Sequence, residues 1–204
     1  MPSFAVLRRR VGFACAVLAI LALSACQTVR VPPAPVTAWR VSRPLLQSLN
    51  RFRLTGRVAV AVGGHGFNAD VLWVQDGKST RMTLSGPLGA DAAQISDDGG
   101  RLGVITSHGR HLGNQAARAV LQRQLGFEPP LASLRYWILG VPDPALPAHV
   151  AINRQQRLAR LRQAGWSIRY HAYQPVGADW LPRLLTVRRA QVRLRMVVDA
   201  WHLQ

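Results

Sequence analysis

Residues 51–73, RFRLTGRVAVAVGGHGFNADVLW, decide the fold of this chain. Apolar side chains recur at every second position from Phe52 to Val62, and the positions between them carry mostly arginine, threonine or alanine. This period of two is typical of a strand with one buried and one exposed face. Gly56 interrupts the apolar series and predicts a bend or a β-bulge at that point.

The second half of the same stretch predicts the partner strand. Residues 63–66, GGHG, favour a turn, and apolar or small residues at alternate positions from Phe67 to Trp73 then share one face. Two alternating runs joined by a glycine-rich turn indicate a β-hairpin. Asp76-Gly77 marks the following turn.

Short alternating runs continue along the rest of the chain. Asp97-Asp98-Gly99-Gly100 separates two of them, and a proline-rich crossing at 142–147 precedes the last group. Such spacing is typical of an antiparallel meander. The strand candidates are 82–84, 92–95, 102–106, 157–161, 166–172, 185–187 and 192–198.

Two helices are expected between the two groups of strands. Asn114 can cap a helix that runs to about Leu125, where Gly126 ends it. Pro130 can open a second short helix through Ile138. Strands, two helices and strands again indicate one antiparallel α+β domain.

The N-terminal segment has the pattern of a bacterial lipoprotein signal. Arginines at 8–10 precede an apolar run at 11–23, which is short for a membrane span, and Leu23-Ser24-Ala25-Cys26 follows. We expect cleavage before Cys26, whose thiol would carry the lipid. An ordinary secretory signal with a chance cysteine, or an uncleaved anchor, is the alternative. Gln27 in place of aspartate favours an outer-membrane address over the inner membrane, as in lipoproteins generally.

This reading divides the chain into three parts. Residues 1–25 are the cleaved signal, residues 26–38 are the acylated cysteine with a proline-rich tether, and residues 39–204 are the folded domain. Cys15 would leave with the signal, so the mature chain has no pair for a disulfide and no cysteine metal site.

The charge of the chain is strongly positive. Lysine and arginine number 26 against 9 acidic residues, a formal net charge of +17, and Lys78 is the single lysine. Export excludes nucleic acid as a partner and leaves anionic lipid, lipopolysaccharide or an acidic carrier protein. The alternative explanation is a compositional bias, in which the proteins of the source organism generally carry arginine on their solvent-exposed surfaces.

The sequence contains no motif for catalysis. It lacks a GxSxG elbow, an HExxH helix, a Walker loop and a dinucleotide fingerprint, and Glu128 is its single glutamate. His108 and His111 could bind a metal on a turn, but two histidines without a third ligand are more often surface residues. We therefore expect neither an enzyme nor a metal or cofactor.

Taken together, several motifs resemble the LolB family of outer-membrane lipoprotein receptors. The likeness covers most of the mature chain, and the motifs are specific only in combination. They are Trp39, Gly56-Arg57, Phe67, Trp73, Gly86-Pro87-Leu88-Gly89, residues 134–142 (LRYWILGVP), Gly165-Trp166, Leu181-Pro182 and Ala200-Trp201.

The resemblance implies a curved antiparallel sheet, an open half-barrel covered by short helices, with an apolar cavity that holds acyl chains. For any one apolar residue, a place in an ordinary solid core is the alternative. The cavity candidates are Val58, Val60, Phe67, Trp73, Leu84, Trp137, Ile138, Trp166 and Met196.

The turn Gly86-Pro87-Leu88-Gly89 is the second candidate site. Proline at its second position would place Leu88 near the tip, where a large aliphatic side chain would ordinarily fold back onto the core. In the family, the leucine of the matching motif protrudes and helps to deliver the lipoprotein into the membrane. The resemblance therefore implies that Pro87, Leu88 and Gly89 form a membrane-release loop.

The resemblance also implies the function and the partners. The protein would accept acylated lipoproteins from the periplasmic carrier LolA and insert them into the outer membrane, where Cys26 anchors it as a monomer facing the periplasm. The alternatives are a structural or scaffold lipoprotein with a solid core and, more remotely, an anchored hydrolase.

Overall fold

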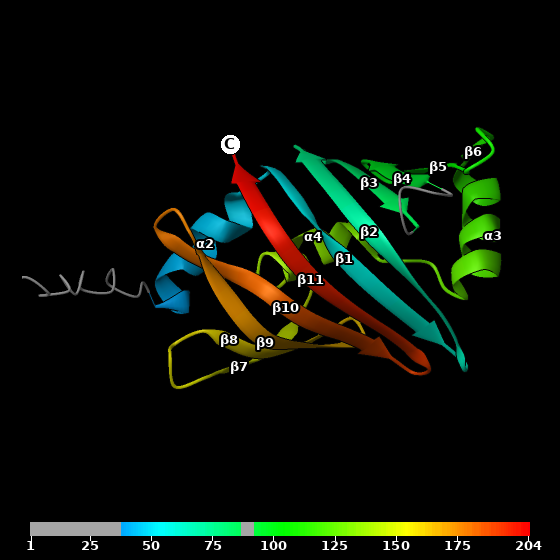
Figure 1. Ribbon diagram of the computed structural model, residues 1–204. Coiled ribbons are helices and arrows are strands. Elements are labelled where there is room, and N and C mark those ends of the chain that lie inside the picture. Colours follow the sequence, from blue (N-terminus) through cyan, green and yellow to red (C-terminus); the bar gives the residue numbers. More distant parts are fainter. Residues whose placement is uncertain (1–37, 87–91) are drawn as a thin grey trace, which may run out of the picture. The chain divides into compact units, whose positions relative to one another are not determined.

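The stretch 51–73 forms the predicted hairpin at the centre of an 11-stranded antiparallel sheet (Figure 1). The computed structural model describes residues 38–86 and 92–204. Strands β1 (Arg51–Val62) and β2 (His65–Asp76) are joined by Gly63 and Gly64. Both glycines have positive φ, 54° and 90°, as a tight two-residue hairpin requires.

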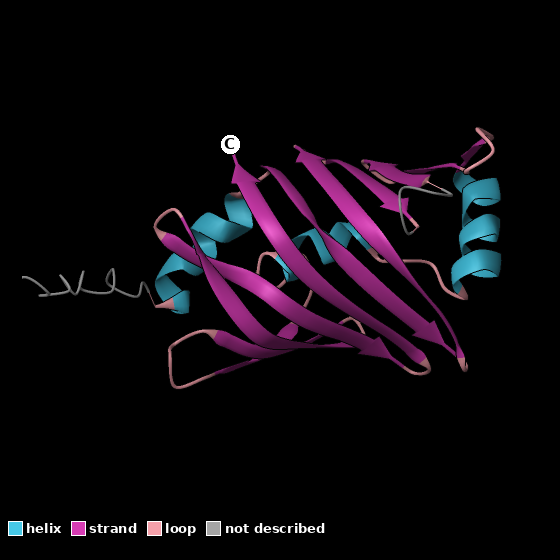
Figure 2. Cartoon of the chain, in the orientation of Figure 1, coloured by secondary structure: helices cyan, strands magenta, loops and turns pink. Residues whose placement is uncertain are grey.

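The other strands extend the sheet on both sides of this hairpin (Figure 2). The order is β6-β5-β4-β3-β2-β1-β11-β10-β9-β8-β7, so the last strand, β11, pairs with the first, β1. β6 and β7 were not among the predicted strands. The remaining bounds are β3 Ser79–Ser85, β4 Ala93–Asp98, β5 Arg101–Ile105, β6 His111–Gly113, β7 Ala148–Ile152, β8 Leu158–Gln163, β9 Trp166–Val176, β10 Asp179–Arg189 and β11 Val192–Leu203.

Gly56 produces the irregularity that the sequence indicated. The register between β1 and β11 shifts between Thr55 and Gly56. A Cβ on Gly56 would lie 2.2 Å from the carbonyl oxygen of Val197, closer than real Cβ atoms come to backbone. Glycine is therefore required here because the two backbones approach closely at the bulge.

Three helices are present among the described residues, α2 (Trp39–Ser48), α3 (Asn114–Leu125) and α4 (Leu131–Ile138). α2 was not predicted, because its sequence is polar and carries Pro44 in its interior. Contacts far along the chain hold it: the backbone N–H of Trp39 donates to Gln156 O at 3.0 Å, and its indole donates to Gly140 O at 2.7 Å.

Of the two predicted ends of α3, the C-terminal one is confirmed and the N-terminal one is not. Gly126 ends the helix in the left-handed conformation, and its N–H donates to Gln122 O, as expected. The prediction that Asn114 caps the helix is wrong. Gly113 occupies that position, no side chain caps the helix, and Asn114 is its first residue with a φ of 41°.

The sheet has two chemically different faces. The inner face packs against the helices and carries the buried positions of β1, Phe52, Leu54, Val58 and Val60. The outer face carries the exposed positions between them. This alternation confirms the predicted α+β class, with an antiparallel open sheet and helices. In the described part of the chain, no helix is long and apolar enough to cross a membrane.

Candidate functional site

An apolar pocket lies on the inner face, beneath α4 and the segment that follows α3. Leu134 of α4 and Phe127 contribute to its wall opposite the sheet. Its volume is about 40 Å³, close to the roughly 30 Å³ that one molecule occupies in liquid water. The pocket is therefore too small to hold an acyl chain as it stands.

A larger groove lies between α3 and the adjoining strands β4 and β5. Its volume is about 600 Å³, and α3 contributes Val120, Leu121 and Leu125 to its wall. Ile95 and Val104 face them from the sheet. One side of this groove is thus a helix that presents aliphatic side chains, as an apolar ligand site requires.

The rim of the groove is polar and positively charged. Arg110 and Arg123 lie on it together with His108, whose Nδ1 is 3.3 Å from the hydroxyl of Ser107. His108 and His111 gain no further ligand, since no group of three metal-binding side chains occurs within residues 38–86 and 92–204. The rim is suited to an anionic surface rather than to a metal ion.

The groove and the pocket are neighbours. Leu84, Ile95 and Leu125 line both of them. The small pocket and the larger groove therefore share part of their walls. We call the pocket and the groove together the inner site.

Helix α3 covers the inner site through apolar contacts. It buries Ala117 and Leu121, and within the described ranges no side chain of α3 makes a hydrogen bond to the sheet. Its ion pair, Arg118 with Glu128 at 3.2 Å, is exposed and joins α3 to the segment that follows it. Exposed pairs of this kind contribute little to stability, so α3 is held mainly by burial of its apolar side chains.

Helix α4, in contrast, is fixed by buried hydrogen bonds. The indole of Trp137 donates to Gln163 Oε1 of β8 at 2.8 Å, and the Gln163 side-chain amide donates to the backbone oxygens of Asp143 and Leu146. Ser133 donates to Asp143 Oδ2 at 2.8 Å. Breaking this network would leave buried polar groups without partners, which makes α4 the immobile wall of the inner site.

Two tyrosines of β9 strengthen the same wall. The hydroxyl of Tyr170 donates to Trp137 O at 2.8 Å, and that of Tyr173 donates to Leu158 O at 2.6 Å. Burial raises the pKa of both phenols above the ordinary range. Both groups therefore stay protonated and act as structural donors.

The structure places the nine cavity candidates in two groups. Trp137, Ile138 and Trp166 are 0%, 0% and 5% exposed and lie in the core between α4, β8 and β9, where the two indole rings are 6.2 Å apart. The other six line the apolar pocket. They are Val58, Val60, Phe67, Trp73, Leu84 and Met196.

Sequence reasoning missed the part of the inner site that α3 and Phe127 form. Val120, Leu121 and Leu125 recur with Ala117 at helical spacing, which indicates an apolar stripe on α3. Phe127 directly follows the capping Gly126, where an apolar residue commonly packs back on the helix. Both signals were available, but neither shows that the stripe covers a pocket.

The lipid-attachment residue and the release loop, Cys26 and Pro87-Leu88-Gly89, lie outside the described residues. The neighbours of the loop are described. Leu84 near the end of β3 and Ala93 at the start of β4 both line the groove, and residues 87–91 join these two strands. In the sequence, the release-loop candidate therefore lies between two strands that each contribute a residue to the groove.

Comparisons with known proteins point to one family. The model of the family described as outer membrane lipoprotein LolB matches residues 50–201. The outer-membrane lipoprotein LolB of Nitrosomonas europaea is 36% identical over 152 residues, which cover 74% of this chain and 72% of that protein. The protein of the same name from Francisella tularensis is 27% identical over 199 residues, 96% of each chain.

Solved structures of low identity share the fold. A LolA superfamily protein from Nitrosomonas europaea is similar with a TM-score of 0.51 and 10% identity, over 83% of this chain and 94% of that one. A DUF1329 family protein from Desulfovibrio piger reaches a TM-score of 0.54 at 6% identity, over 80% and 90%. At these identities the likeness concerns the arrangement of strands and helices alone.

Proposed function

This chain belongs to the LolB family of outer-membrane lipoproteins, non-enzymatic receptors that insert lipoproteins into the outer membrane, and we propose that it performs this task by sheltering acyl chains in the inner site beneath α3. The observation that carries the proposal is the contact between groove and pocket. Leu84, Ile95 and Leu125 line both, so a chain that enters the groove meets the pocket next.

The energy of the cargo explains why a shelter is needed. Exposing a methylene group to water costs about 0.8 kcal/mol, so a sixteen-carbon chain costs roughly 12 kcal/mol. Unassisted transfer between membranes is negligible at such a cost. A groove of about 600 Å³ with an aliphatic wall removes part of that surface from water.

Full burial of the chain requires the pocket to widen, and α3 is the element that moves in this proposal. Its displacement breaks no hydrogen bond to the described part of the sheet, whereas α4 is tied to β8 and β9 through Trp137. An incoming acyl chain would replace the apolar contacts that α3 loses. Acyl binding and opening are therefore one event.

Transfer in one direction follows from relative affinities. The chain carries no nucleotide-binding motif, so acyl chains can move only toward tighter binding. The inner site must hold them more tightly than the donor does and less tightly than the bilayer does. The donor contact must also be transient.

We assign the carrier contact to the rim of the groove. Arg110 and Arg123 on this rim suit an acidic surface on the periplasmic carrier LolA. Steering of this type raises the association rate more than the affinity. Carrier docking that persists in an Arg110→Glu, Arg123→Glu double variant would argue against the electrostatic part.

We assign release to Leu88 and anchoring to Cys26. Pro87-Leu88-Gly89 stand in the connection between two strands that line the groove, so an apolar side chain there would meet the bilayer next to the cargo. Lipid on Cys26 and the tether of residues 26–38 would keep the body near the membrane; two or more acyl chains make such anchoring stable.

The second candidate function is a scaffold lipoprotein with a solid core. The small volume of the pocket, about 40 Å³, favours it. The receptor function requires saturable binding of an acyl chain, whereas the scaffold function does not.

Titration with a fluorescent fatty acid distinguishes them. We expect saturable binding that Leu125→Asp abolishes, because a carboxylate would stand where groove and pocket meet. Ala119→Asp, an exposed position on the same helix, is the matched control and should bind as the wild type does. Absence of saturable binding in a folded wild type would leave the scaffold function.

A further inference from the structure

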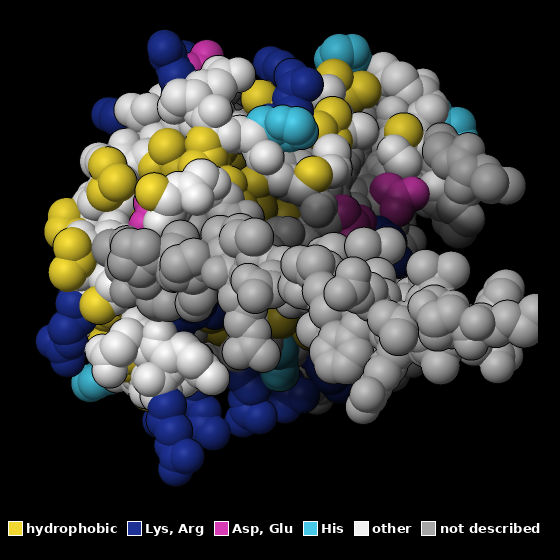
Figure 3. Space-filling view, turned by 60° about the vertical axis from the view of Figure 1, so that its left-hand side comes forward, with side chains coloured by type: hydrophobic (Ala, Val, Ile, Leu, Met, Phe, Trp, Pro, Cys, Tyr) yellow, Lys and Arg dark blue, Asp and Glu magenta, His cyan; other side chains and the backbone are white. Residues whose placement is uncertain are grey.

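Six exposed arginines gather on the outer face of strands β8–β11, on the side of the sheet away from the inner site. Figure 3 shows lysine and arginine side chains along the lower edge of the molecule, the level at which β7 and β8 run in Figure 1. We call the six residues the outer arginine patch. They are Arg160, Arg162, Arg169, Arg188, Arg193 and Arg195.

Strand register sets these arginines in two parallel rows. The first row runs Arg195, Thr186, Arg169, Arg160 across β11, β10, β9 and β8. The second runs Arg193, Arg188, Ser167, Arg162 across the same strands. With neighbouring strands about 4.8 Å apart, each row is about 14 Å long, and the rows lie about 7 Å from each other.

Neither row contains a carboxylate, and the described ion pairs lie elsewhere. The acidic residues nearest in register are Asp70, one two-residue step along the strands from the first row, and Asp199, two such steps from Arg195 on β11. Asp199 is already paired with Arg57 at 3.1 Å. The positive charge of the patch is therefore not balanced within the described sheet.

The patch places like charges directly opposite each other. Arg188 faces Arg193 across β10 and β11, and Arg160 faces Arg169 across β8 and β9. Cross-strand pairs of like charge destabilise a sheet. An anionic partner would remove this repulsion on binding.

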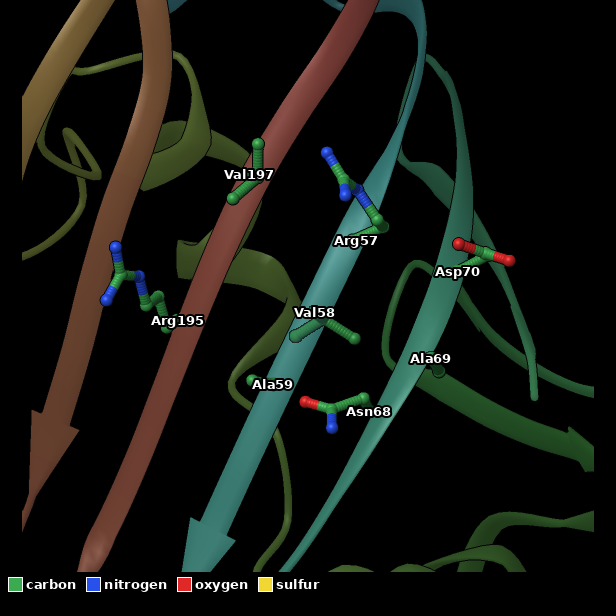
Figure 4. A pocket seen from close by; sticks show the side chains of 8 residues that line it. All are labelled: Arg57, Val58, Ala59, Asn68, Ala69, Asp70, Arg195 and Val197. Carbon is green, nitrogen blue, oxygen red and sulfur yellow. The ribbon is translucent and has the colours of Figure 1, made fainter. Parts of the chain in front are cut away.

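The residue type indicates the chemistry of that partner. Guanidinium presents a planar set of donors that matches phosphate, whereas lysine is a point charge. A hollow of about 430 Å³ borders the first row, and Arg195 and Arg57 line it together with Ala59, Val197 and the carboxylate of Asp70 (Figure 4). Another, of about 460 Å³, borders the second row at Arg162 and His149.

We propose that the outer arginine patch is a membrane-docking surface that binds the phosphate groups of anionic phospholipids. The protein is an outer-membrane lipoprotein, so a bilayer surface is always near its body. A carrier protein bound at the patch could not pass an acyl chain to the inner site, because the sheet lies between them; this second argument rests on the proposed function. Docking through the patch gives a receiving orientation, in which the inner site faces an arriving carrier; delivery into the bilayer then requires the patch to leave the membrane.

A site-specific probe on the acylated mature protein tests the proposal without any cargo. Cys26 is the one cysteine expected in the mature chain and carries the lipid, so Ser167→Cys adds a single reactive thiol within the patch. A fluorophore there should be quenched by headgroup-labelled lipid in vesicles containing phosphatidylglycerol. The control probe, Ala119→Cys on α3, should be quenched much less.

Charge reversal gives the decisive comparison. Arg169→Glu with Arg195→Glu should weaken patch contact about thirtyfold or more, and 1 M salt should also weaken it strongly, because it shortens the screening length to about 3 Å. Arg40→Glu with Arg154→Glu, two exposed arginines outside the rows, should change little. Circular dichroism checks the fold of each variant.

Three results would overturn the proposal. Equal quenching in purely zwitterionic vesicles would show that the patch does not recognise the net negative charge of anionic phospholipids. Unchanged quenching in the folded Arg169→Glu, Arg195→Glu variant would exclude the patch. Normal vesicle contact together with lost carrier binding in that variant would assign the patch to a protein partner.

Discussion

The two faces of one sheet carry opposite chemistry on neighbouring residues. On β11, Leu194 and Met196 line the apolar pocket, while Arg193 and Arg195 stand on the outer face between and beside them. A period of two lets one strand serve an acyl chain on one side and charged headgroups on the other. The inner face supplies most of the buried core; in our proposals it also binds the cargo, while the outer face contacts the membrane.

The largest expected effect is on stability and comes from the inner side. Trp137→Ala removes a fully buried side chain and leaves Gln163 without one of its partners, so we expect a loss of about 3–5 kcal/mol in the free energy of unfolding. Urea denaturation measures it. Arg195→Ala on the outer face should change the same quantity by less than about 0.5 kcal/mol; a comparable loss in both variants would break the comparison.

Removing an arginine from the patch should instead stabilise the protein slightly. Arg188→Thr abolishes the like-charge pair with Arg193, and we expect a gain of about 0.2–1 kcal/mol at low salt that shrinks as salt is added. Thermal unfolding in two salt concentrations measures it. Arg154→Thr is the control outside the rows, and a loss of stability in Arg188→Thr alone would mean that the arginines are structural.

The smallest effect concerns acid stability. Burial, followed by repulsion from Arg169, Arg195, Arg188 and Arg193, lowers the pKa of His171 below its ordinary value. The unfolded chain therefore takes up a proton at His171 more readily, and stability falls as pH drops through about 6.5, with no contribution above it.

Substitution of this histidine isolates the effect. His171→Gln can keep the contact with the hydroxyl of Thr186, at 3.0 Å in the structure, and should flatten the fall in stability between pH 7 and pH 5. The change should be small because only a minor part of the His171 ring is buried and most of the residue is exposed. Identical pH profiles for the two proteins would show that the surrounding arginines do not act on His171.

The sequence was sufficient for the central strands of the sheet, because each repeats the same local pattern, but not for the short edge strands β6 and β7. Alternation from Phe52 to Val62, the glycines of the turns and the bulge at Gly56 are all local signals that the structure confirms. α2 was not predicted because its position depends on hydrogen bonds to residues far along the chain, such as those from Trp39 to Gly140 and Gln156.

The inner site was only partly predictable for the same physical reason. Strand parity identifies the residues of one face, and six of the nine cavity candidates do line the pocket. Parity cannot separate Trp166, which packs against Trp137, from Trp73, which reaches the pocket. That distinction depends on where α3 and α4 cross the sheet.

Cargo transfer is the measurement that tests the central claim most directly. A soluble form that begins at Gln27 would be mixed with LolA loaded with an acylated lipoprotein, and cargo would be followed onto the receptor and then into liposomes. We expect the wild type to accept and deliver cargo, Leu125→Asp to fail at acceptance, and Leu88→Glu to accept cargo without delivering it. Acceptance by Leu125→Asp at the wild-type level would contradict the claim that acyl chains enter beneath α3.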